Sequence, residues 1–110
     1  MLSEAVERSA LTEAVYYILL SLYSPLHGYG IMQNVKELSH ERVNLGAGTL
    51  YGAINTLLEK QWIMPIEGGN DSRKKEYVIT ELGQSIVRGE ILRLEELIRN
   101  GKMIVGGEPN

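Results

Sequence analysis

Hydrophobic residues recur at helical spacing in four stretches of the chain, and two runs typical of strands lie before the fourth. The first stretch, residues 12–23, carries one apolar face and, beside it, a second stripe of Tyr16, Leu20 and Tyr23. A helix that is apolar on two sides needs a cover on each, supplied by its own chain or by a partner subunit. Ser24-Pro25 ends this helix, because proline cannot continue it.

The next two helices are separated by a short link. The first of them opens at Gly28 and ends near Ser39-His40, and the alternation in Val43-Asn44-Leu45 predicts a very short strand. Gly46-Ala47-Gly48-Thr49 then forms a turn into a helix that reaches about Gln61. Its predicted buried stripe is Leu50, Ile54, Leu57 and Leu58. The opposite face is small and polar, and it consists of Gly48, Gly52, Asn55, Thr56 and Glu59.

The last part of the chain predicts a hairpin and a final helix. Residues 62–66 and 75–79 are strand-like, and turn-forming residues lie between them. Pro65 indicates an edge strand, since proline donates no ladder hydrogen bond. Thr80 is a candidate N-cap for the final helix, and Asn100-Gly101 is a candidate C-cap. This helix carries an apolar seam that consists of Val87, Ile91, Leu94 and Ile98.

Length and composition fit one domain with a modest core. The chain has 110 residues, of which 44% are hydrophobic and 23% are charged. It contains no cysteine, which excludes disulfides and thiolate zinc sites, and its two histidines make a histidine metal site unexpected. The longest apolar run is too short to span a bilayer, and the N-terminus lacks the basic start of a signal peptide. We therefore expect a cytoplasmic protein without a membrane partner.

The net charge of −3 on its own argues mildly against a nucleic-acid partner. However, residues 42–75 carry five basic side chains against three acidic ones, whereas the remainder carries six against eleven. The chain therefore combines a mildly basic segment with an acidic body. We expect non-specific binding to DNA to be weak and easily lost when salt is added.

The order of predicted elements is helix, helix, short strand, helix, strand, turn, strand, helix. A linked helix pair followed by a hairpin with a basic tip is the order of a winged helix-turn-helix, whose third helix lies in the major groove. The predicted fold class is thus mainly α (α+β), a winged helix-turn-helix with an additional C-terminal helix. Units of this kind also bind proteins, so pattern alone leaves a DNA-binding module and a protein-binding adaptor open.

Five short motifs, in order along the chain, resemble the PadR family of bacterial transcription regulators. They are Leu11-Thr12-Glu13 with Tyr16-Tyr17-Ile18-Leu19, His27-Gly28-Tyr29-Gly30-Ile31, Gly48-Thr49-Leu50-Tyr51-Gly52-Ala53, Lys74-Lys75 with Tyr77, and Thr80-Glu81-Leu82-Gly83. The resemblance covers about residues 11–83, and the single short C-terminal helix is similar to that of the compact subgroup. The resemblance implies a homodimeric repressor that binds a two-fold symmetric operator in double-stranded DNA. It also implies release by a small hydrophobic or aromatic effector, without a cofactor.

On this basis we divide the chain into four segments. Residues 1–11 form a flexible N-terminal segment or helix extension, and residues 12–80 form the DNA-binding winged helix-turn-helix. Residues 81–104 form the dimerisation helix, and residues 105–110 form a disordered tail.

Candidate DNA contacts lie on the third helix, the second helix and the hairpin tip. Thr49 could donate to a phosphate while it caps the helix, and the Tyr51 hydroxyl could reach the DNA backbone. Asn55 could read adenine in the major groove. The plainer interpretations are a simple N-cap for Thr49, core packing for Tyr51 and solvated surface for Asn55. The full predicted set is Lys36, Gly48, Thr49, Tyr51, Gly52, Asn55, Thr56, Arg73, Lys74 and Lys75.

A dimer interface and an effector pocket are also predicted. The interface joins the seam of the final helix to the second stripe of the first, and it consists of Tyr16, Leu20, Tyr23, Val87, Ile91, Leu94 and Ile98. Packing within one chain is the alternative. Tyr16 and Trp62 are candidates for the effector pocket, although Trp62 is also typical of a core residue at the base of a strand. His27 is expected to shape its loop through a local hydrogen bond.

An enzyme is the remaining class of function. The sequence offers no nucleophile–base pair, no phosphate-binding loop and no constellation of metal ligands. The sequence therefore predicts a DNA-binding regulator that is not an enzyme, and a winged-helix adaptor without DNA binding is the alternative.

Overall fold

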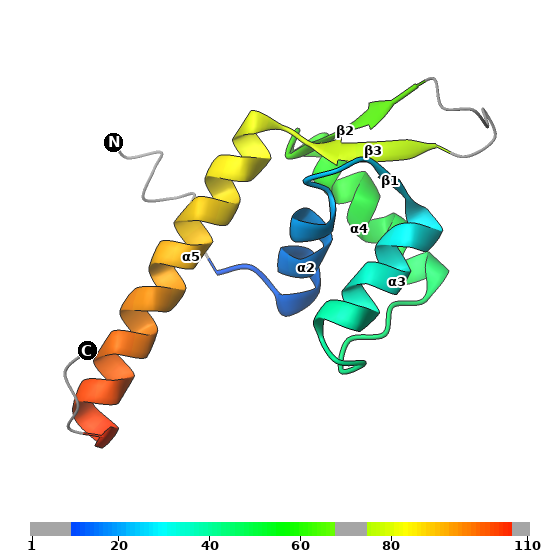
Figure 1. Cartoon of the computed structure of the whole chain (residues 1–110). Helices are drawn as coiled ribbons and strands as arrows, with labels where there is room; N and C mark the ends of the chain where they lie inside the picture. Colours follow the sequence, from blue (N-terminus) through cyan, green and yellow to red (C-terminus); the bar gives the residue numbers. More distant parts are fainter. Residues whose placement is uncertain (1–9, 68–74, 107–110) are drawn as a thin grey trace.

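The part of the chain that the structure describes begins with three helices and a two-residue strand. A computed structural model describes residues 10–67 and 75–106. These elements are α2 (Glu13–Ser21), β1 (Leu26–His27), α3 (Gly28–Leu38) and α4 (Ala47–Glu59). The hairpin strands β2 (Ile63–Ile66) and β3 (Glu76–Ile79), the long helix α5 (Glu81–Gly101) and a π-helical turn η1 (Lys102–Gly106) follow. Figure 1 shows α2, α3 and α4 gathered beneath the small sheet, with α5 leaving this body.

Side-chain caps explain where three of the helices begin. Thr12 accepts the backbone N–H of Val15 at 3.1 Å at the start of α2. His27 Nδ1 accepts the N–H of Gly30 at 3.3 Å at the start of α3, which is the local hydrogen bond expected of His27. Helix α4 differs, because its N-cap is Gly46 and no side chain caps it. The expected capping role of Thr49 is therefore wrong, since Thr49 lies inside the first turn.

The sheet has the antiparallel strand order β1-β3-β2. Pro65 pairs with Tyr77 on the edge strand β2, as predicted. The strand expected at residues 43–45 is wrong, because this link has no regular structure and its Val43 N–H is taken by the Ser39 hydroxyl at 2.9 Å. The third strand is instead β1, where Leu26 lies opposite Tyr77 on the other edge of β3. A strand forms at this place because β3 offers it a free edge, whereas residues 43–45 have none beside them.

The core lies between the three short helices, the inner face of the sheet and the first half of α5. Its buried members are Ile18, Leu19, Leu22, Ile31, Val35, Leu50, Ile54, Leu57, Ile63, Tyr77, Ile79, Ile86 and Val87. The stripe predicted for the third helix is confirmed, with Leu58 only partly buried. The expected helix end is confirmed to within one residue, because α5 ends at Gly101, whereas its C-cap is Lys102 and the chain continues into η1.

Helix α5 is fixed to the body at its first turn by a close backbone approach. The Thr80 N–H donates to the Trp62 carbonyl at 2.9 Å, and the Thr80 hydroxyl lies 3.0 Å from the same oxygen. The hydroxyl oxygen also accepts the Gly83 N–H at 3.0 Å, which caps the helix. A side chain at Gly83 would overlap the Trp62 carbonyl, so this position requires glycine. In the part of the chain that the structure describes, no helix is long and apolar enough to cross a membrane.

The substitution Gly83→Ala is expected to lower the free energy of unfolding by about 1–3 kcal/mol, because the added Cβ meets backbone that cannot turn aside. Gly52→Ala is the matched control, since a Cβ at this helical glycine meets nothing within 4 Å. It should raise the free energy of unfolding by about 0.5–1 kcal/mol. Denaturant unfolding of both variants measures the difference, and equal effects would contradict the proposed close approach.

Candidate nucleic-acid interface

The face of α4 opposite the core is exposed and small. Gly48, Gly52, Asn55 and Thr56 are all exposed, as the helical spacing predicts. A Cβ built on either glycine meets nothing within 4 Å, so a flat surface can approach the helix backbone closely there. The Thr56 hydroxyl donates back to the Gly52 carbonyl at 3.3 Å, which leaves its lone pairs as acceptors. Asn55 keeps an amide that can both donate and accept.

Tyr51 connects α4 to the beginning of α3. Its side chain is exposed, yet its hydroxyl lies against Gly28 so closely that a Cβ at Gly28 would overlap it. The two interpretations of Tyr51, packing and surface contact, are therefore compatible. The hydroxyl also lies beside the first turn of α3, where unpaired backbone N–H groups favour anions.

The basic candidates lie outside α4. Lys36 lies in the last turn of α3 and is half-buried, and Lys75 is exposed directly before β3. Arg73 and Lys74 fall outside the described residues, so their position in the wing stays a prediction. Thr49 is exposed in the first turn of α4, beside Gly48.

An ion pair that sequence reasoning missed ties the link before α4 to α2. Arg42 donates to both carboxylate oxygens of Glu13, with 3.1 Å from Nη1 to Oε1. These hydrogen bonds from Arg42 hold the pKa of Glu13 below its ordinary value. Arg42 is therefore already paired with a carboxylate. The basic excess counted over residues 42–75 consequently attracts a nucleic acid less than the count suggests. The link itself holds His40 and Glu41 in the left-handed region, with φ of 54° and 66°.

The predicted dimer surface divides into buried and exposed parts. Val87 is 2% exposed and belongs to the core of its own chain, so for this residue the alternative of intrachain packing holds. Ile91 is exposed, Leu94 is half-buried and Ile98 is 56% exposed. Tyr16 and Leu20 of α2 are half-buried and pack on the core, whereas Tyr23, just after the end of α2, is exposed. The apolar stripe of α5 thus continues past the point where the body stops covering it (Figure 1).

A buried carboxylate beside this stripe was also missed from the sequence. Glu90 is 4% exposed and accepts from Arg93 Nε at 2.9 Å, from Arg93 Nη2 at 2.7 Å and from the Leu11 N–H at 3.4 Å. The hydrogen bonds from Arg93 lower the pKa of Glu90, although burial opposes them. The three-residue spacing of Glu90 and Arg93 in the sequence predicts an ion pair along one helix. Nothing in the sequence predicts that the carboxylate is buried.

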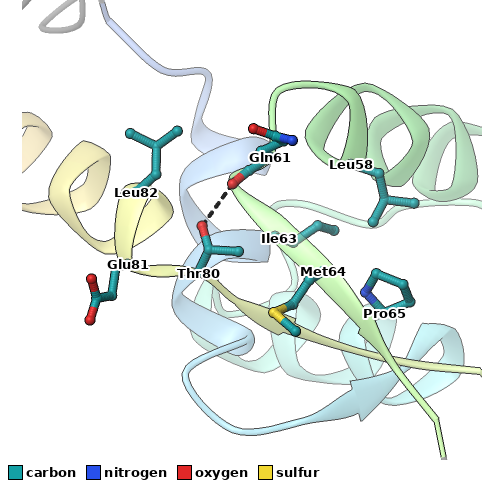
Figure 2. Close-up of a pocket in the computed structure, with 8 residues that line it drawn as sticks. All are labelled: Leu58, Gln61, Ile63, Met64, Pro65, Thr80, Glu81 and Leu82. Carbon is teal, nitrogen blue, oxygen red and sulfur yellow. Dashed lines mark hydrogen bonds between the residues drawn. The ribbon is translucent and has the colours of Figure 1, made fainter.

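The two candidates for an effector pocket have different neighbours. Tyr16 lies near Tyr17, with 5.9 Å between ring centroids, and burial together with the charge of Glu90 raises its pKa. Trp62 lies under the Lys60 ammonium, 5.1 Å from its ring centroid. A hollow of about 700 Å³ instead lies between the end of α4, β2 and the start of α5 (Figure 2). Neither Tyr16 nor Trp62 lines it. Among the described residues, no three metal-binding side chains lie close enough together to hold an ion.

Comparisons with known proteins agree with this geometry. A family model described as the transcriptional regulator PadR-like family matches residues 17–88. The structure of a PadR family transcriptional regulator from Eggerthella lenta matches with a TM-score of 0.69 at 22% identity, over 94% of this chain and 89% of that one. A transcriptional regulator from Clostridium thermocellum matches with a TM-score of 0.65 at 21% identity, over 87% of this chain and 90% of that one. At such identities, the two structures show the fold alone.

A curated relative also matches in sequence. It is an uncharacterized 37.1 kDa protein in a transposon of Streptomyces fradiae, 31% identical over 86 residues. The match covers 78% of this chain and 23% of that protein, so the chain spans less than a quarter of this relative.

The buried Glu90 should make stability depend on pH in one direction. Because its folded pKa lies below the ordinary 4.5, its contribution is present above pH 4.5 and is lost as pH falls through the lower folded value. Glu90→Gln should cost about 1–3 kcal/mol at neutral pH and flatten the acid limb of the stability profile. Glu13→Gln, at an exposed ion pair, is the control and should cost less. An unchanged acid limb in Glu90→Gln would contradict the assignment.

Proposed function

Since the chain belongs to the PadR-like family of transcriptional regulators, we propose that it binds a two-fold symmetric operator as a homodimeric repressor. The family consists of regulators, which confirms the prediction that the chain is not an enzyme. In this proposal, residues 12–80 bind DNA, residues 81–104 join the subunits, and a small hydrophobic or aromatic molecule releases the operator. The observation that carries it is the pair of surfaces that the described residues leave exposed, the small polar face of α4 and the apolar stripe of α5.

We place α4 in the major groove. Its thirteen residues span about 20 Å, and its exposed face carries only small or polar side chains near the N-terminus. Gly48 and Gly52 let the helix approach the groove, and Asn55 and Thr56 supply the donors and acceptors that base edges require. A helix with this profile matches the recognition helix of winged helix-turn-helix proteins.

Phosphate contacts surround α4 in this arrangement. Thr49 lies in the first turn of α4, where backbone N–H groups and the helix dipole attract anions. The Tyr51 hydroxyl and Lys36 approach the flanking backbone, and Lys75 leads into the wing. Arg73 and Lys74 complete the set as wing contacts. Contacts of this kind fix the register of a protein on DNA, whereas base contacts select the sequence.

A second copy of the chain is the cover that we propose for α5. Its exposed stripe includes Ile91 and Ile98, with the half-buried Leu94 between them, and exposed apolar side chains follow in η1, among them Val105. A stripe of that length needs a partner helix, and a closed two-fold interface brings the same stripe of both subunits together. Tyr16 and Leu20 of α2, and Tyr23 just after it, lie at the edge of this interface in the proposal. The two recognition helices then lie about 34 Å apart, one turn of DNA.

The wing contact is tested by the salt dependence of binding. Arg73→Ala should weaken binding to every sequence and reduce the slope of log K against log salt by about one unit for a lost phosphate contact. Arg99→Ala, which removes the same charge from the exposed distal end of α5, should leave the slope unchanged. Fluorescence anisotropy over a series of salt concentrations measures both. An unchanged slope in Arg73→Ala would remove the wing from the interface, and binding of a protein partner without DNA would favour the adaptor.

The dimer surface is tested with substitutions outside the core. A chain with Ile91→Asp and Ile98→Asp together should be monomeric in sedimentation, while its circular dichroism stays native, because both side chains are exposed in the single chain. Leu92→Asp is the matched control. Leu92 is 54% exposed, close to Ile98 at 56%, but it lies about 100° around the helix from Ile91, so this variant should stay dimeric. A dimeric double variant would show that α5 does not join the subunits in this way.

A further inference from the structure

The hollow between β2 and α5 is the cavity that the proposed DNA contacts and dimer do not use. Its apolar wall consists of Leu58, Ile63, Met64, Pro65 and Leu82. The polar lining residues are Gln61, Thr80 and Glu81 (Figure 2). Met64 is 48% exposed and Leu82 is 39% exposed, so water meets apolar surface here. The three elements that form the hollow are the end of the proposed recognition helix, the wing strand and the start of α5.

This hollow lies on the other side of α5 from the proposed dimer stripe. Leu82 precedes Ile91 by nine residues, and at about 100° per residue the two side chains point about 180° apart. A second subunit packed on Ile91 and Ile98 therefore leaves the hollow open. The hollow is also separate from the positions of Tyr16 and Trp62, neither of which lines it.

The chemistry of the lining selects a type of ligand. Glu81 is the one charged side chain among the eight residues that line the hollow. The positive end of the α5 dipole is equivalent to about half an elementary charge, so it offsets only part of the negative charge of a carboxylate. The Thr80 hydroxyl is already occupied, since it accepts the Gly83 N–H and lies 2.7 Å from the Gln61 carbonyl that it donates to. The neighbouring cation, Lys60, is held over Trp62. An anionic ligand would thus meet an uncompensated carboxylate, and a cationic ligand would meet its counter-charge.

We propose that the hollow binds a small molecule with an apolar body and a single positive charge. Its volume of about 700 Å³ falls in the range of small-molecule sites. The apolar body lies on Met64, Pro65 and Leu82, and the flexible Met64 side chain adapts to its shape. The positive charge faces Glu81.

A ligand here contacts the junction that fixes α5 to the body. Gln61 and Thr80 are joined across it by the 2.7 Å hydrogen bond drawn in Figure 2, and Gln61 has the left-handed φ of 63°. A ligand that binds one arrangement of this junction more tightly than another would shift the population toward that arrangement. The spacing of the two recognition helices would then change. This regulatory consequence rests on the proposed function, whereas binding in the hollow does not.

The binding test uses three probes of one shape and different charge. They are 2-naphthylmethylammonium, 2-naphthylmethanol and 2-naphthoate, titrated into the full chain labelled with ¹³C at the methionine methyl groups. The Met64 methyl signal should shift with the cation, while those of Met32 and Met103 stay in place. The cation should bind about two- to fivefold more tightly than the alcohol, as expected of a partly exposed charge pair, and the anion least tightly.

Two variants assign the preference to Glu81. Glu81→Gln should remove the advantage of the cation over the alcohol and leave the affinity of the alcohol unchanged. Glu95→Gln, on the exposed surface of the same helix but outside the hollow, should keep the advantage. Equal affinities for cation and alcohol in the native chain, no saturable binding, or a shift confined to another methionine would each overturn the proposal.

The regulatory part has its own readout. Adding 2-naphthylmethylammonium should change the affinity of the native chain for its selected operator and leave that of Glu81→Gln unchanged. Binding in the hollow with no effect on operator affinity would overturn the regulatory part alone. If the native chain binds no DNA, the proposed function fails, and the methyl shifts still decide whether the hollow is a cation site.

Discussion

The close approach of Gly83 to the Trp62 carbonyl is the constraint on which the arrangement of the molecule depends. It brings the first turn of α5 onto the backbone that connects α4 to β2, and Thr80 fixes the contact with hydrogen bonds to both sides. Any larger residue at position 83 would push the helix away, because the atom that it meets belongs to the backbone. The helix that we propose as the dimer contact is thus attached directly to the end of the proposed recognition helix.

A second attachment defines the direction of α5. Glu90 lies seven residues beyond Gly83, about 10 Å along the helix, and it accepts hydrogen bonds from Arg93 and from the Leu11 N–H. Together, the two attachments set the direction in which α5 leaves the body (Figure 1). In a dimer joined through α5, that direction sets the separation of the two recognition helices. Operator spacing, ligand response and stability then depend on the same few contacts.

Much of this structure follows from local pattern. The helices, the buried stripe of α4, the edge position of Pro65 and the cap at Thr80 could be predicted because each rests on nearest neighbours in sequence. The short strand could not, since Leu26 and His27 become a strand only where β3 lies beside them. The cap of α4 was not predicted, because residues 46–49 are typical of a turn leading into a helix, whereas the N-cap is Gly46 and the helix already begins at Ala47.

The candidate site also combines features that local sequence predicts with features that depend on distant parts of the chain. The exposed face of α4 could be predicted from helical periodicity, whereas the ion pair of Arg42 with Glu13 joins residues 29 positions apart. Val87 continues the apolar seam in sequence, yet it is covered by its own chain, because the body ends only after the next helical turn. The hollow between β2 and α5 has no sequence signal, since three separated segments form it.

Selection of bound sequences from random duplex DNA at two salt concentrations tests the central claim most directly. A homodimer joined through α5 should enrich a motif with two inverted half-sites about one helical turn apart, and the same motif at both salt concentrations. Enrichment of a single unpaired half-site, of half-sites with no fixed spacing, or of no motif would contradict it.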